Sequence, residues 1–271
     1  MRPCKIKSVI ITKRSLRRVI SEEEAYNYYL YFSKGSSKTP PAVQGFWRRS
    51  KGAALHFGRI DYLNLLPFHV FMKRYLRSSR SQMMLRHGAN VPSAINRAYR
   101  MRKIDAAFIS SIRARRQKHL NLGIMADGAV QSVLLLPSQT PQTDRASETS
   151  NRLAAVLGLE GRVLIGDPAL RVYLEGVEAV DLAAEWKARH GLPFVFALLC
   201  YQSGDTQMKK LGRAFERHPK KIPQYLLQRA SKRSGVAPEH ILAYLERIHY
   251  RLDHRAHRSL RKFWRLADAA R

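Results

Sequence analysis

From residue 55 to residue 201 the sequence alternates between short apolar runs and longer amphipathic segments, and no other feature limits the possible folds so strongly. Residues 193–201 (PFVFALLCY) have the length and apolar character of a buried strand. Residues 91–104 are typical of a helix, with Pro92 or Ser93 at its start. Strands that alternate with helices indicate βαβ units. We therefore expect an α/β fold with a parallel sheet.

The same patterns predict further elements. Strands are expected at residues 55–63, 82–85, 105–110, 121–126, 130–137 and 161–166, and helices at residues 66–77, 110–119, 149–158 and 182–189. After Ser203 and Gly204 we expect only helices, which would form a helical C-terminal region. Within residues 241–252 apolar side chains recur at spacings of 3 and 4, which is typical of one helical stripe.

The charge is distributed unevenly, and this suggests the domain organisation. The formal net charge is +29, yet residues 138–192 carry 8 acidic residues against 6 basic ones. One long apolar strand enters this middle segment and another leaves it. We therefore expect two lobes, the first formed by residues 55–132 together with residues 201–271, and a smaller second lobe inserted as residues 133–200. Residues 1–54 would be a basic N-terminal extension.

A strong positive charge attracts nucleic acid, acidic lipid or a small dicarboxylate alike, and does not choose among them. The basic side chains of residues 247–265 could touch RNA, but a run of charge is usually a solvated face, so we do not expect nucleic acid as a partner. No apolar run approaches the roughly 20 residues of a membrane span. The stretch SVIIT is too short for a signal-peptide core. We expect a cytoplasmic protein with no membrane partner, and the oligomeric state is open.

Small polar residues stand at four places where a strand is expected to meet a helix. Free N–H groups at a helix start, with the positive end of the helix dipole, can hold a carboxylate without a buried arginine. The same residue types are the preferred N-caps, worth about 1 kcal/mol each, so every junction alone has a structural explanation. Both interpretations stay open, and a ligand site gains weight only because the four junctions would face one cleft. The residues are Asn64, Ser110, Ser111, Thr149, Ser150, Asn151, Gly166 and Asp167.

The familiar catalytic motifs are absent. The sequence contains no HExxH, CxxC pair, GxSxG or GxxxxGK[ST] motif, and Cys4 and Cys200 have no metal-binding spacing. We expect neither a metal nor another cofactor. His254 and His257 stand in a basic helical stretch and are expected to be solvated. Three aromatic residues are expected in the core rather than in a substrate platform: Trp186, Phe194 and Phe196.

Six stretches follow one another in a specific order: GRIDYLNLLPF, VPSAINRAYRMRKIDAAFISSI, VQSVLLLP, DRASETSN, VLIGDPAL and DLAAEWKARHGLPFVFA. From about Phe57 to the C-terminus they resemble the chorismate dehydratase family of menaquinone biosynthesis, which opens the futalosine route. The resemblance implies a two-lobed α/β fold like that of type II periplasmic binding proteins, with residues 130–137 and 192–201 as the crossing strands. It also implies a hydro-lyase, in which chorismate loses its C4 hydroxyl and C3 proton as water and gives 3-[(1-carboxyvinyl)oxy]benzoate.

The resemblance implies roles for individual residues as well. Asn64, at the family's YLN position, would hold the side-chain carboxylate of the substrate or the departing hydroxyl, while that carboxylate takes the C3 proton. Ser110 and Ser111 from the first lobe, and Thr149 and Ser150 from the second, would bind carboxylates at helix starts. Aromatisation supplies the driving force, so orientation would matter more than a strong protein base.

Two departures from the family leave open how the second carboxylate is held. An arginine often precedes the Thr-Ser pair, and Glu148 stands there in this sequence. The second lobe, between Ser138 and Leu192, also looks short, and Asp167 has the alternative role of capping its helix. Three other functions remain as alternatives: a cytoplasmic small-anion binding protein of the same fold, the related 1,4-dihydroxy-6-naphthoate synthase, and a basic protein associated with RNA.

Overall fold

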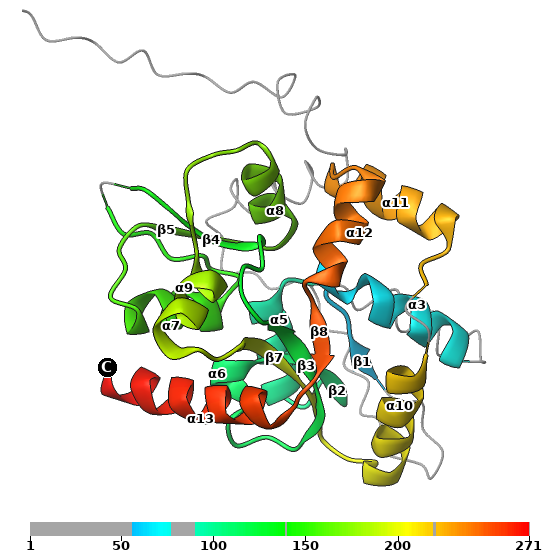
Figure 1. Ribbon diagram of the computed structural model, residues 1–271. Coiled ribbons are helices and arrows are strands. Elements are labelled where there is room, and N and C mark those ends of the chain that lie inside the picture. The colour runs from blue at the N-terminus through cyan, green and yellow to red at the C-terminus, as the bar shows by residue number, and fades with distance from the viewer. Residues whose placement is uncertain (1–55, 77–89, 139, 219–220, 271) are drawn as a thin grey trace, which may run out of the picture. The chain divides into compact units, whose positions relative to one another are not determined.

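A computed structural model describes residues 56–76, 90–138, 140–218 and 221–270 (Figure 1). All of them belong to one compact unit, Ala53–Arg271. The expected strand at residues 82–85 and the expected basic extension of residues 1–54 lie outside the described residues.

The larger sheet has five strands. Their order is β1 (Phe57–Gly58), β2 (Ala106–Ser110), β7 (Phe194–Tyr201), β3 (His119–Ala126) and β8 (His249–Arg251). Strand β1 pairs with β2 in parallel, whereas β7 is antiparallel to both β2 and β3, and β8 is antiparallel to β3. The expected parallel sheet is therefore wrong. Strands β1, β2 and β3 do share one direction, but β7 runs the opposite way between β2 and β3.

The smaller sheet has three strands, all from the middle of the chain. Their order is β5 (Arg162–Ile165), β4 (Val133–Leu136) and β6 (Val180–Asp181), and both pairs are antiparallel. Three helices pack against this sheet, namely α7 (Glu148–Val156), α8 (Gly166–Leu174) and α9 (Leu182–His190). This mixture of sheets and helices confirms the α/β class.

The other described helices surround the five-stranded sheet. They are the 3₁₀ turn η1 (Leu63–Leu65), α3 (Leu66–Tyr75), α5 (Pro92–Arg100), α6 (Ser111–Ala114), α10 (Asp205–Arg217), α11 (Gln224–Ser234), α12 (Pro238–Glu246) and α13 (His254–Ala269). No helix among the described residues combines the length and apolar character needed to span a membrane.

Local signals explain where several helices begin and end. Proline occupies the first position of α5, where its missing N–H is not needed. The Asp181 side chain caps α9 by accepting hydrogen bonds from the backbone N–H groups of Ala183 and Ala184, each at 3.0 Å. Gly191 ends the same helix in the left-handed conformation, with φ of 65°.

Two elements differ from the sequence patterns because sheet pairing overrides them. Helix α12 ends at Glu246, and the predicted continuous helical stripe is replaced by strand β8, which pairs with the edge of β3. Ile248 and Leu252 are still buried, but Leu242 is 46% exposed. The helix expected at residues 110–119 is only the four-residue α6, because β3 already begins at His119.

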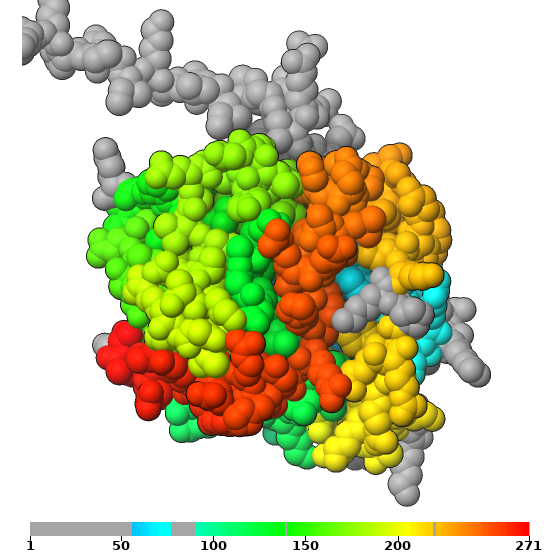
Figure 2. Space-filling view, in the orientation of Figure 1, coloured from blue at the N-terminus to red at the C-terminus, as the bar shows by residue number. Residues whose placement is uncertain are grey.

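Two aromatic clusters hold the elements that flank the cavity described below. Phe68 of α3 packs against the rings of Phe57 and Phe108, with centroids 5.4 and 5.0 Å apart, and so fixes η1 and α3 on the larger sheet. Trp186 of α9 is fully buried, and its indole Nε1 donates to the Ser259 hydroxyl of α13 at 3.0 Å. Figure 2 shows the C-terminal segment, in red, lying along the yellow-green residues of α7 and α9.

Strand β7 pairs within the larger sheet, whereas the expected division placed residues 194–200 in the second lobe. The chain passes from the larger sheet to the smaller one through residues 127–132, and it returns to the larger sheet through residues 182–193. The lobe boundaries themselves remain a prediction.

Candidate active site

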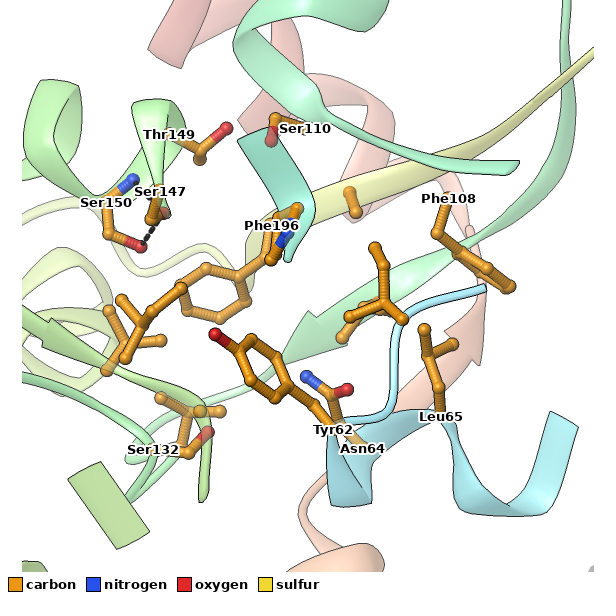
Figure 3. Close-up of a pocket in the computed structure, with 18 residues that line it drawn as sticks. Tyr62, Asn64, Leu65, Phe108, Ser110, Ser132, Ser147, Thr149, Ser150 and Phe196 are labelled. Atoms are coloured by element: carbon orange, nitrogen blue, oxygen red, sulfur yellow. Dashed lines mark hydrogen bonds between the residues drawn. The ribbon is translucent and has the colours of Figure 1, made fainter. Parts of the chain in front are cut away.

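A cleft is lined by residues of both sheets and of the helices and loops that adjoin them (Figure 3). Its volume is about 600 Å³ when the space open to solvent at its mouth is included. The lining residues are Ile60, Tyr62, Asn64, Leu65, Pro92, Phe108, Ser110, Ile124, Val130, Ser132, Val133, Ser147, Thr149, Ser150, Ile165, Gly166, Phe196 and Ala197. Among these described lining residues, only Tyr62 has an ionisable side chain.

Asn64 lies in the 3₁₀ turn that follows β1. The turn closes through the hydrogen bond from Leu65 N–H to Tyr62 carbonyl oxygen at 3.0 Å, and the carbonyl oxygen of Asn64 accepts from the Tyr250 hydroxyl at 2.5 Å. Its side-chain oxygen Oδ1 is buried and has no hydrogen-bond partner among the described residues. Leaving such an oxygen unpaired costs about 1–3 kcal/mol. The Asn64 amide therefore keeps unused hydrogen-bonding capacity at the wall of the cleft.

A buried tyrosine stands behind Asn64. The Tyr244 hydroxyl pairs with the Ser132 hydroxyl at 2.9 Å, and Ser132 lines the cleft. Burial raises the pKa of Tyr244 far above its ordinary value, and the hydrogen bonds from Ser132 and the Asn64 side chain oppose this only partly. Tyr244 is therefore a neutral phenol at physiological pH, suited to holding hydroxyl and amide groups in place.

Ser110, at the end of β2, is oriented by a second asparagine. The Asn96 side chain of α5 accepts from Ser110 N–H at 3.1 Å and donates to the Ser110 hydroxyl oxygen at 2.8 Å. Because this oxygen already accepts a hydrogen bond, the hydroxyl proton can be donated into the cleft. The pair makes Ser110 a directed donor at the wall of the larger sheet.

Helix α7, which packs on the smaller sheet, points its N-terminus at the cleft close to Ser110. Its N-cap is Ser147, whose hydroxyl oxygen accepts from Ser150 N–H at 3.1 Å and whose hydroxyl donates to the Ser150 hydroxyl oxygen at 2.8 Å. Figure 3 shows Ser147 and Ser150 on one side of the cleft and Asn64 on the other. The hydroxyls and the positive end of the helix dipole together make a suitable place for an anionic group.

The seam between α6 and α7 closes one side of the cleft. The Thr149 hydroxyl lies 3.4 Å from the Ser111 hydroxyl and accepts from Ile112 N–H at 3.3 Å. Beside them, Arg113 forms an ion pair with Glu148, which raises the pKa of the Arg113 guanidinium. A cation from the larger sheet's side thus neutralises the acidic residue in the first turn of α7.

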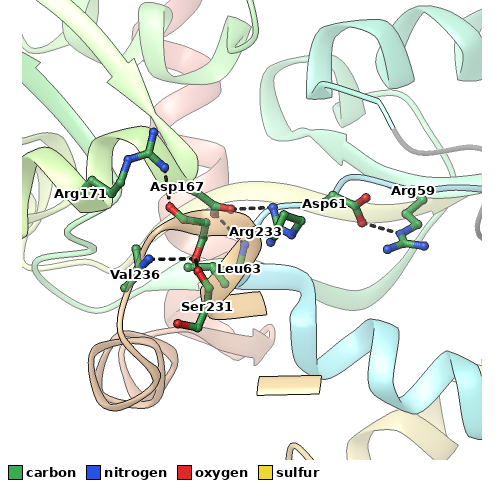
Figure 4. Close-up of polar contacts among 9 residues, drawn as sticks. Arg59, Asp61, Leu63, Asp167, Arg171, Ser231, Arg233 and Val236 are labelled. Atoms are coloured by element: carbon green, nitrogen blue, oxygen red, sulfur yellow. Dashed lines mark hydrogen bonds and ion pairs between the residues drawn. The ribbon is translucent and has the colours of Figure 1, made fainter. Parts of the chain in front are cut away.

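Helix α8 closes the other side of the cleft and begins with Gly166. Its φ is 70°, and a Cβ atom there would lie 2.7 Å from Cζ of the Tyr62 ring. Only glycine lets the ring of Tyr62 pack this closely on the start of α8. The next residue, Asp167, accepts from Leu63 N–H at 2.8 Å and pairs with Arg233 at 2.9 Å (Figure 4).

Five of the eight residues singled out from the sequence line the cleft, namely Asn64, Ser110, Thr149, Ser150 and Gly166. The other three are bound to protein groups. Ser111 is fully buried against Thr149, Asn151 exchanges two hydrogen bonds with the backbone of Asp144, and Asp167 holds Leu63 and Arg233. Substrate-binding roles for these three residues are not supported by their placement.

Sequence reasoning missed several residues of the cleft. Ser147 caps α7 and lines the cleft, but the sequence analysis singled out only Thr149, Ser150 and Asn151 in this stretch. Phe196 was expected in the core and lines the cleft instead, whereas Trp186 and Phe194 are buried as expected. No sequence signal marked Asn96 or Ser132, because their roles depend on partners far along the chain. His257 is hydrogen-bonded to Asn121 at 3.0 Å, and His254 is exposed.

Within the part of the chain that the structure describes, no three His, Cys, Asp or Glu side chains come together as ligands for a metal ion. The cleft presents hydrogen-bonding groups with fixed directions. Amide and hydroxyl groups lie on the larger sheet's side, and a helix N-terminus lies on the smaller sheet's side. Such an arrangement can bind an anion and orient hydroxyl groups.

Comparison with known proteins gives a consistent result. A family model described as menaquinone biosynthesis matches residues 55–159 and 146–269. A curated relative, the chorismate dehydratase of Campylobacter jejuni, is 39% identical over 197 residues, which cover 72% of this chain and 88% of that protein.

Among solved structures, protein AF1704 from Archaeoglobus fulgidus has a TM-score of 0.60 at 14% identity, covering 81% of this chain and 98% of its own. The alkanesulfonate-binding protein SsuA from Xanthomonas axonopodis gives a TM-score of 0.44 at 12% identity, with coverage of 82% and 93%. The likeness to AF1704 concerns the fold alone.

Proposed function

The chain belongs to the menaquinone biosynthesis family, and from this premise we propose that it is a chorismate dehydratase, the carbon–oxygen lyase that opens the futalosine route. The observation that carries the proposal is the 39% identity to the Campylobacter jejuni enzyme over most of both chains. The cleft supports it, because its amide, hydroxyl and helix-start groups suit a substrate with two carboxylates. The proposal retains the cytoplasmic location expected from the sequence.

In the proposed reaction the substrate supplies its own base. The carboxylate of the enolpyruvyl side chain takes the C3 proton, the C3–H electrons form the new ring double bond, and the C4–O bond breaks. The departing hydroxide receives the proton and leaves as water, and the product ring is aromatic. The lining of the cleft agrees with this route, since it holds no carboxylate, histidine or lysine among the described residues. The protein contributes orientation and hydrogen bonds.

Asn64 is proposed as the catalytic residue that holds the reacting groups. Its amide nitrogen would donate to the side-chain carboxylate or to the C4 oxygen of the substrate. Ser110 would donate to a carboxylate from the larger sheet's wall. Thr149 and Ser150, together with the Ser147 cap, would bind the second carboxylate at the start of α7.

The decisive experiment mixes purified full-length protein with chorismate, without added metal or nucleotide, and follows the enolpyruvyl benzoate by chromatography and mass spectrometry. We expect turnover in the wild-type protein and a kcat lower by about 100-fold or more in Asn64→Ala, because loss of one positioned hydrogen-bonding group has that scale. Asn121→Ala, which changes an exposed asparagine outside the cleft, serves as the control.

The alternatives give different results in the same assay. An anion-binding protein of this fold would bind chorismate without converting it. The related naphthoate synthase would leave chorismate unchanged and would not form the benzoate. Near-normal turnover in Asn64→Ala would remove Asn64 from the mechanism.

A further inference from the structure

Asp167 is a buried carboxylate outside the cleft lining, with an exposed fraction of 6%. Both of its oxygens are occupied by protein groups. Oδ1 accepts from Leu63 N–H at 2.8 Å, and Oδ2 accepts from Arg233 Nη1 at 2.9 Å. A carboxylate used in this way has little capacity left for a ligand, so its function must lie in what it holds.

What Asp167 holds is the turn that carries Asn64. Leu63 and Asn64 are adjacent in η1, and the N–H of Leu63 is the group bound by the carboxylate. On the same side, the ring of Tyr62 rests on Gly166, the residue before Asp167. The start of α8 therefore contacts two consecutive residues immediately before Asn64.

Asp167 also belongs to a reciprocal pair of links between α8 and α11. Arg233 of α11 reaches the carboxylate of Asp167, and Arg171 of α8 donates to the carbonyl oxygen of Ser234 at 2.5 Å (Figure 4). Helix α8 packs on the smaller sheet, while η1 joins the larger sheet to α3. The Asp167 carboxylate thus links α8, which packs on the smaller sheet, both to helix α11 and to the turn that carries Asn64.

From this geometry we propose that Asp167 is a positioning residue for the dehydration. It fixes the backbone of the Asn64 turn and makes the placement of Asn64 depend on the docking of α8. The inference rests on the proposed function, in which Asn64 acts on the substrate. Arg233 supports the same role from the other side by holding the carboxylate in the orientation that Leu63 requires.

The test measures steady-state kinetics with chorismate for two single variants of the full-length protein, Asp167→Asn and Arg233→Gln. Asp167→Asn keeps an acceptor for Leu63 N–H but loses the charge that pairs with Arg233. Because an error of about 1 Å in the position of a catalytic group can cost about 100-fold in rate, we expect kcat to fall by about 10- to 100-fold while KM changes much less. Arg233→Gln, which leaves Asp167 in place, should lower kcat in the same direction by a smaller factor.

The distinguishing measurement repeats both substitutions in an Asn64→Ala background. A residue that acts through Asn64 adds no further loss there, whereas a residue that only supports the fold lowers the rate by the same factor in both backgrounds. Arg229→Gln, an exposed arginine on the same helix, and Asp253→Asn, another aspartate that accepts a backbone N–H, serve as matched controls and should keep the wild-type kcat.

Equal losses in both backgrounds would overturn the inference and leave the dehydratase proposal intact. Failure of the wild-type protein to convert chorismate would overturn the proposed function itself. If Asp167→Asn does not fold, Arg233→Gln carries the same comparison.

Discussion

Replacing Gly166 by alanine tests how closely the cleft is built around one backbone position. The residue has a φ of 70°, and an added Cβ would lie 2.7 to 2.8 Å from three carbons of the Tyr62 ring. The left-handed conformation costs a residue with a side chain roughly 1–2 kcal/mol. The ring must also move, and overpacking adds about 1–3 kcal/mol where the neighbour is rigid. Tyr62 lines the cleft and is only partly buried, so its ring can swing into the cleft.

A matched control separates the two effects. Gly158 has a φ of 61°, but a Cβ there would meet nothing within 4 Å. Gly158→Ala should therefore lower the free energy of unfolding by the backbone cost alone, about 1–2 kcal/mol, and leave activity unchanged. Gly166→Ala should lose at least as much stability in denaturant unfolding and should also lose kcat/KM, because the displaced ring occupies substrate space. Equal kcat/KM in the two variants would refute the close packing of Tyr62 on Gly166.

Two further predictions concern charge. Arg113→Gln leaves Glu148 uncompensated beside the start of α7, so KM for chorismate should rise by up to about five-fold at low salt, the scale of about 1 kcal/mol for an exposed pair. The double variant Arg113→Gln/Glu148→Gln should recover the wild-type KM, and a KM that stays high would contradict the electrostatic explanation. Burial, assisted by the charge of Arg59, lowers the pKa of His69 to about 3 from its ordinary 6.5. The folded state therefore disfavours the protonation of His69. The contribution of neutral His69 to the free energy of unfolding is complete above pH 6.5 and declines as the pH falls toward 3. Unfolding free energies measured at pH 7 and pH 5 should differ less in His69→Gln than in the wild-type protein.

Elements with strong local signals were predictable from the sequence. Helix α5 begins at its proline, and helix α9 runs from an aspartate cap to a glycine in the left-handed conformation. Strand β2 is buried along its whole length, as its apolar run indicated. In each case the residues that decide the structure lie within the element or next to it.

The sequence-based predictions that failed share one physical cause. Each concerns a feature that is decided by contacts with residues distant in the sequence. No local pattern of the sequence places β7 between β2 and β3, or turns the end of an apparent helical stripe into strand β8. The same holds at the cleft. Asn64 and Ser110 were found because a polar residue after a strand is a local signal. Asp167 was singled out because it stands at the same kind of junction, but the backbone N–H that its carboxylate holds belongs to Leu63, 104 residues away in the sequence.

The position of β7 has a consequence for how a nascent chain acquires its structure. Strands β2 and β3 leave the ribosome long before β7, the strand that must bridge them, and the edge strand β8 emerges later still. The three strands of the smaller sheet all come from residues 133–181 and can pair as soon as they are made. We expect the smaller sheet to assemble first during synthesis. Until β7 is made, the edges of β2 and β3 that it will cover remain unpaired and can pair with other chains.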